Sequence, residues 1–368
     1  MASESIRLSN ESRWIAGLAI AAGLASIGAF AIGGAVGVPV GQVYYGYVRF
    51  ILVFGIVTIL AGATALAVGA AICGVKSPLA ATGRLASRKI GSVDQAVGIF
   101  GPILLIPLLL GAYGTLKQMM PLVAPFAWDG VFAEAERQLF FGHRPWELTH
   151  ALFGGPVASH TIDLLYGMWV PLVFVVVMAV AVVAPSYLRA RFFVTFAGCW
   201  LLLGIVGAFL LSSAGPCYEH LVSPNSANAF LPLLERLHSI NDSGFRIQSV
   251  HWQDVLWQAH VSGDYGFGMG ISAMPSLHNS VAFLYVLSAR RAWIPLRVAS
   301  LGFAGVIFVG SVHLGWHYLL DGIVSWAGTA LIWWGSPAYL RWCGYQRPDT
   351  DAQKAGSCNP PSPEPVTA

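Results

Sequence analysis

Two short segments of the sequence combine residue types that could carry nucleophilic and acid–base chemistry. The first is Pro275-Ser276-Leu277-His278, and the second runs from His313 through His317 to Asp321. His317 and Asp321 are four residues apart, so on a helix they share one face and can hydrogen-bond. A carboxylate that holds one ring nitrogen leaves the other nitrogen a better nucleophile or base. Taken alone, the pair could equally be a buried polar contact that locks helix packing.

The first segment has the features of an anion site. Pro275 suits the first turn of a helix, and Ser276 with the free backbone N–H groups of that turn could bind an anion. His278 lies in the same turn and could exchange a proton with a bound group, although a capped interfacial histidine is the simpler interpretation. Together, two histidines, a carboxylate and an anion-binding turn are the parts that phosphoryl transfer needs.

The elements that must position these residues are membrane-spanning helices. Only 10% of the 368 residues are charged and 56% are hydrophobic, whereas soluble globular chains average roughly 25% charged residues. This composition excludes an ordinary water-soluble protein and a disordered chain, and the net charge of +3 gives no support for a nucleic-acid partner. Uncharged stretches of membrane length predict an all-α, polytopic transmembrane helix bundle of about eight spans, at residues 14–37, 50–75, 95–116, 164–188, 192–213, 267–289, 298–312 and 317–340.

Basic residues in the short connections predict the orientation of the bundle. They follow the second, fourth, sixth and eighth spans, which all end on the side of the N-terminus. We therefore expect a multi-pass cell-membrane protein with both termini in the cytoplasm. All ten histidines then lie at the extracytoplasmic face, as do two long connections, 117–163 and 214–266. Residues 230–237 and 251–257 of the second connection are typical of interfacial amphipathic helices.

Over roughly residues 117–335, the sequence resembles the type 2 phosphatidic acid phosphatase (PAP2) superfamily of membrane phosphatases and phosphotransferases. That family is known by the motifs KxxxxxxRP, PSGH and SRxxxxxHxxxD. The second motif is matched at residues 275–278, with Leu277 in place of glycine, and the third at residues 310–321, with Ser311 in place of arginine. The first motif is matched at residues 137–145, with Arg137 in place of lysine. The combination is similar to the branch of fungal inositol phosphorylceramide synthases and their bacterial relatives.

The resemblance implies a role for each residue of the two histidine segments. His317 would attack phosphorus and carry the transferred group, Asp321 would orient it, and His278 would protonate the leaving alkoxide and then deprotonate the acceptor. No metal or other cofactor is implied, and the partners would be membrane lipids in the bilayer. The phosphate-binding side chains would be Ser276, Arg144, Arg137 and His313.

Other uses of the same residues are less consistent with the sequence. His313 and His317 have the spacing of a metal-binding pair, but the other histidine boxes of a membrane di-iron oxidase are absent, and Leu314 stands where a zinc protease has glutamate. A serine nucleophile at Ser276 would lack an evident oxyanion turn. Lys117, near the end of the third span, is interpreted as a snorkelling side chain, although it could reach a phosphate.

The favoured function is a lipid phosphotransferase that moves a phospho-headgroup to a lipid alcohol such as ceramide. The alternatives are a lipid phosphate phosphatase with water as acceptor and a non-catalytic membrane scaffold or carrier. The expected organisation is a two-helix membrane extension at residues 1–95, a six-helix catalytic membrane domain at 96–340 and a disordered cytoplasmic tail at 341–368.

Overall fold

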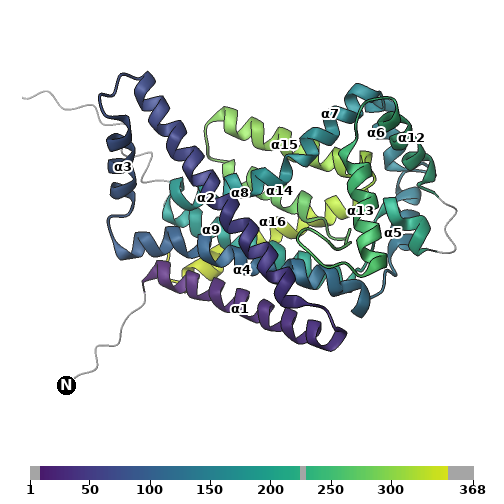
Figure 1. The fold of residues 1–368 in the computed structure, drawn as a ribbon, viewed down its shortest axis with the longest axis horizontal. Helices are drawn as coiled ribbons and strands as arrows, with labels where there is room; N and C mark the ends of the chain where they lie inside the picture. Colours follow the sequence, from purple (N-terminus) through teal and green to yellow (C-terminus); the bar gives the residue numbers. More distant parts are fainter. Residues whose placement is uncertain (1–8, 224–228, 347–368) are drawn as a thin grey trace, which may run out of the picture.

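The computed structural model describes residues 9–223 and 229–346, and all the regular structure within them is helical (Figure 1). The predicted all-α bundle is therefore confirmed. Most of the predicted disordered tail, from residue 347 onward, lies outside the described residues. The helices are α1 (Asn10–Val36), α2 (Val40–Ile72), α3 (Pro78–Lys89), α4 (Val93–Val123), α5 (Asp129–Leu139), α6 (Pro145–Phe153), α7 (Pro156–Gly167), α8 (Trp169–Val183), α9 (Ser186–Gly198), the π-helix η1 (Cys199–Gly207), α10 (Ala208–Leu210), the 3₁₀-helix η2 (Pro216–Tyr218), α11 (Glu219–Val222), α12 (Leu231–Asp242), α13 (Gln248–Ser262), α14 (Leu277–Ala289), α15 (Ile294–His313) and α16 (Leu319–Trp342).

Six helical stretches in the described part of the chain are long and apolar enough to cross a membrane. They are α1, α2, α4, the joined α7 and α8, the continuous stretch from α9 to α10, and α15. These stretches identify a multi-pass membrane protein. The predicted spans at 267–289 and 317–340 correspond to α14 and α16, which are not among the six.

The span predicted at 267–289 is helical only from Leu277 to Ala289. Such a helix measures about 20 Å, too short to cross a bilayer core of about 30 Å. The preceding residues form an irregular loop in which Gly268 and Gly270 take positive φ values of 77° and 101°, a conformation that glycine adopts without strain. The stretch is apolar, as predicted, but the prediction of a continuous span was wrong, because its glycines take positive φ values that an α-helix does not contain.

The two N-terminal helices share a core with the rest of the bundle. The carboxylate of Glu11 in α1 forms a buried ion pair with Arg189 in α9, at 3.0 Å, and accepts a hydrogen bond of 2.8 Å from the indole of Trp14. Trp14 in turn stacks on Phe193, with ring centroids 6.2 Å apart. In Figure 1, α1 and α2 lie against α4, and α2 crosses the bundle diagonally.

The amphipathic segments predicted at 230–237 and 251–257 are helical and belong to α12 and α13. Together with α5 and α6 they gather at one end of the bundle (Figure 1), and we call these four helices the helical cap. The buried carboxylate of Asp163 accepts hydrogen bonds from the first amides of α13, including that of Ser249 at 3.0 Å. The hydroxyl of Ser249 accepts a hydrogen bond of 2.9 Å from Trp316, so the cap is tied directly to the turn that carries His317.

Candidate active site

His317 lies in the short turn between α15 and α16. Its Nδ1 is 3.0 Å from the carbonyl oxygen of Ala273 and 3.2 Å from Oδ2 of Asp321. A carbonyl oxygen can only accept a hydrogen bond, so Nδ1 carries the proton and Nε2 keeps its lone pair. The turn itself is closed by Gly315, with φ of 75°, and by a hydrogen bond of 3.0 Å from the His317 amide to the Ser311 carbonyl. The sequence pair is thus assembled with Nε2 as the nitrogen available for attack on phosphorus.

Asp321 occupies the first turn of α16 and is fully buried. Its Oδ2 accepts the backbone amide of Tyr318 at 3.0 Å as well as facing His317. A carboxylate at this position is stabilised by the exposed N–H groups and the dipole of the helix. The start of α16 therefore holds the Asp321 carboxylate in position, and this carboxylate orients the His317 ring.

His278 is the second residue of α14, and its ring lies beside that of His317. The two ring centroids are 5.7 Å apart. The His278 ring stacks on that of Tyr166, with centroids 5.1 Å apart, and packs at a tilt against Trp169, with centroids 4.2 Å apart. The Trp169 indole donates a hydrogen bond of 3.1 Å to the His278 carbonyl. This aromatic support holds a second titratable ring beside that of His317.

Ser276 is the N-cap of α14 and is fully buried. Its Oγ accepts hydrogen bonds from the backbone amide and the side-chain amide of Asn279, at 3.3 and 3.1 Å. The same Asn279 amide donates to the hydroxyl of Ser311 at 3.2 Å. The structure thus places Ser276 at the expected helix start, where its hydroxyl supports the turn, and Ser311 joins α14 to α15 at the position where the family motif has arginine.

Lys117 in α4 is close enough for its charge to act on both His278 and His317. The sequence interpretation favoured snorkelling to the interface for this residue, and the alternative was that it reaches a phosphate. Its only sequence signal was a single lysine close to a charge-free span, and such residues are costly and commonly functional. Lys117 is therefore a further candidate for the positive charge of the site.

The other predicted phosphate-binding cations lie elsewhere among the described residues. Arg137 is half-exposed and forms an ion pair with Glu134, at 2.7 Å. Arg144 lies over the ring of Phe230, 4.9 Å from its centroid, and donates a hydrogen bond of 3.2 Å to the Ala133 carbonyl. Neither guanidinium makes a contact with His317 or its carboxylate in the described structure.

His313 is likewise directed away from His317. Its ring stacks on that of His150, with centroids 3.9 Å apart and planes 10° apart, and its Nε2 is 2.9 Å from the hydroxyl of Ser159. His313 and His317 therefore do not converge on a common point, as a metal-binding pair would. Within the described residues, no group of three His, Cys, Asp or Glu side chains could hold a metal ion.

Two buried carboxylates of α5, Asp129 and Glu136, hold the His317 turn in place. Asp129 accepts hydrogen bonds from the amides of Ala214 and Gly215, both at 2.8 Å, and from the hydroxyl of Tyr318 at 3.0 Å. Glu136 accepts the backbone amide of Leu319 and that of the next residue, at the start of α16. The sequence analysis assigned neither residue to the site, although their spacing of seven residues puts both on one helix face.

The pKa of Glu136 is raised to about 8, first by burial and then by the negative charge of Asp321. A raised carboxyl pKa means that the folded state binds the proton more tightly than the unfolded state. The stability of the wild type should therefore fall as pH rises from the unfolded pKa, near 4.5, to about 8, and should level off above it. In the Glu136→Gln variant, whose amide oxygen can still accept the α16 amides, this decline should be absent.

Melting temperatures in detergent between pH 5 and pH 9 would measure this difference. The matched control is Glu134→Gln, because Glu134 lies on the exposed face of the same helix. If the melting temperatures of wild type and Glu136→Gln changed with pH in the same way across the whole range, the assignment would be contradicted.

The fold defines a multi-pass membrane protein, and its site brings together two histidines, His278 and His317, and the buried carboxylate of Asp321. The chain belongs to the PAP2 superfamily, whose family model matches residues 131–335, more than half of the chain. The matched region contains the His278, His317 and Asp321 positions and begins after α1, α2 and α4. Comparisons with curated proteins and with solved structures gave no match.

Proposed function

We propose that the protein is a lipid phosphotransferase, similar to inositol phosphorylceramide synthases, that works through a phosphohistidine intermediate at His317. The observation that carries the proposal is the double contact of His317 Nδ1 with Asp321 and with the Ala273 carbonyl. These contacts leave Nε2 unprotonated, and the His278 ring lies beside it. This arrangement supports the roles of nucleophile for His317, orienting carboxylate for Asp321 and proton donor for His278.

In the first half of the reaction, Nε2 of His317 attacks the phosphorus of a phospholipid and forms a P–N bond. The P–O bond to the lipid alcohol breaks, and protonated His278 gives its proton to the leaving alkoxide. Asp321 stabilises the positive charge that develops on the His317 ring. The ammonium of Lys117 balances the charge on the non-bridging phosphate oxygens.

In the second half, neutral His278 removes a proton from the hydroxyl of the acceptor. The acceptor oxygen attacks phosphorus, the P–N bond breaks, and its electron pair returns to Nε2. Transfer to a lipid alcohol is supported by burial, because the His317 side chain is 7% exposed and that of Asp321 is 0% exposed. A site that excludes bulk water protects a phosphohistidine from hydrolysis.

The charge pattern of the connections supports an extracytoplasmic active site, with both termini in the cytoplasm. We propose that the helical cap lies at the extracytoplasmic interface, where it covers the headgroups of the substrates. We also propose that residues 96–340 form the catalytic domain and that residues 1–95 are an extension of it.

Purified protein supplied with phosphatidylinositol labelled in its headgroup and with ceramide would test the function. The expected product is a labelled sphingolipid formed in step with release of diacylglycerol. Release of inorganic phosphate from simple lipid phosphates, without any transferred headgroup, would instead identify a PAP2-type phosphatase that uses water as acceptor.

Replacement of Lys117 should weaken transition-state binding. In Lys117→Met, kcat/KM should fall by about 10- to 100-fold, since one charge-assisted contact to the phosphate is lost. Lys117→Arg should restore part of this loss, and Arg137→Met should match the wild type because Arg137 pairs with Glu134 on the surface. Steady-state rates with the labelled phospholipid measure all three, and equal losses in Lys117→Met and Arg137→Met would contradict the assignment.

A further inference from the structure

The loop between α13 and α14, residues 263–276, carries two elements of the active site at its end. The carbonyl of Ala273 fixes the His317 tautomer, and the loop continues directly into Ser276 and His278. Its first part contains Gly263, Gly266, Gly268 and Gly270, three of which have positive φ values. Glycine-rich backbone has many accessible conformations, so this loop needs external contacts to hold its carbonyl in one place.

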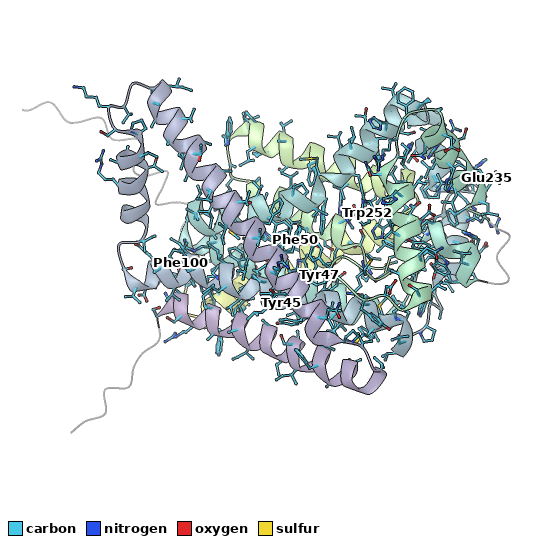
Figure 2. All side chains as sticks on the ribbon, viewed as in Figure 1. Tyr45, Tyr47, Phe50, Phe100, Glu235 and Trp252 are labelled. Atoms are coloured by element: carbon cyan, nitrogen blue, oxygen red, sulfur yellow. The ribbon has the colours of Figure 1, made fainter. Side chains whose placement is uncertain are left out.

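Helix α2 provides those contacts in the middle of the loop. The ring of Phe267 stacks on Phe50, with centroids 4.1 Å apart and planes 29° apart, and lies 4.7 Å from the ring of Tyr47. The next residue, Gly268, donates its backbone amide to the hydroxyl of Tyr47 at 3.1 Å. Tyr47 and Phe50 are labelled in Figure 2, on the part of α2 that crosses the centre of the bundle.

Contacts on both sides of this aromatic cluster continue the support toward the active site. Gln118, the neighbour of Lys117 in α4, accepts the amide of Gly266 at 2.9 Å. At the other end, the amides of Ala273 and Met274 donate to the carbonyl and the hydroxyl of Ser213, at 2.9 and 3.1 Å. The loop is thus held in its middle by α2, and α2 lies outside the region that the family model matches.

We propose that α2 is a positioning element for catalysis, in which Tyr47 and Phe50 hold the 263–276 loop and thereby set the Ala273 carbonyl against His317. This inference rests on the proposed role of His317 and gives the N-terminal extension a part in it. Tyr47 and Phe50 act only through the loop. A displacement of about 1 Å in a catalytic group costs up to about 100-fold in rate, so a small shift of this loop has a measurable effect.

The test compares variants of the aromatic cluster in the full-length protein. Phe267→Leu should lower kcat by about tenfold, and Tyr47→Phe, which removes only the bond to Gly268, by about threefold. KM and the melting temperature should stay close to wild type in both. Phe267→Tyr, which keeps the ring, should restore kcat, and the Tyr47→Phe/Phe267→Leu double variant should lose less than the product of the two single losses, because both act on one contact.

Tyr45→Phe is the matched control, because Tyr45 lies on the same helix but is 64% exposed. Wild-type kcat in both Tyr47→Phe and Phe267→Leu would overturn the inference, as would losses of kcat that follow the melting temperature. Transfer and hydrolysis both begin with attack by His317. The identity of the product therefore tests the proposed function, whereas the ratio of variant to wild-type kcat tests the role of α2.

Discussion

The His317→Ala variant should lose turnover by about 10³-fold or more and should trap no phosphate on the protein. The reason is that no other nitrogen occupies the position of Nε2, which the contacts of Nδ1 with Ala273 and Asp321 define. Brief incubation of the wild type with labelled phospholipid, followed by denaturation in alkali, should leave an acid-labile label on the chain. The same treatment of His317→Ala should leave none.

His143→Ala is the control for this experiment. His143 has a side chain that is 74% exposed and contacts only Glu147 among the ion pairs of the described structure. Its replacement should leave both turnover and the trapped label unchanged. Full turnover in His317→Ala would contradict a covalent mechanism through His317.

The second large effect is expected from His278, because it moves the proton in both halves of the reaction. His278→Gln should lower kcat by about 10²- to 10⁴-fold with natural lipid donors, whose leaving alkoxides need protonation. A donor with a nitrophenol leaving group needs no such help, so the first step of the variant should approach the wild-type rate with that donor. His317→Ala should remain inactive with either donor.

Stopped-flow release of nitrophenol separates the two steps. A burst followed by a slow phase is expected for His278→Gln, since the second step still lacks its base. An equal loss of burst rate with both donors would exclude proton transfer by His278 and leave only a packing role against Trp169.

The central site could be predicted because its geometry is local or follows from topology. His317 lies just before α16 rather than on one helix face with Asp321, but the two residues are close in sequence and their contact is local. The alternation of basic connections predicts that the start of α14 lies at the same end of the bundle. The shortened α14 could not be predicted from hydropathy, because glycine contributes to an apolar average while it interrupts a helix.

The charged partners of the site were harder to predict. Arg137 matched a family motif, yet Glu134 three residues earlier already offered it a local partner. Lys117 and Glu136 reach the site from helices that are distant in sequence, and only tertiary packing shows that they do. The family resemblance was sufficient to single out His278, His317 and Asp321, which the structure brings together, and insufficient to identify the cations around them.

The two carboxylates of α5 have a consequence for substrate binding. Asp129 and Glu136 hold the side chain of Tyr318 and the first amides of α16, directly after His317, before any lipid arrives. The turn therefore has little conformational entropy left to lose when a substrate binds. No binding free energy is then needed to order the His317 turn. It can instead offset the conformational entropy that the flexible chains and headgroup of the lipid lose in the complex.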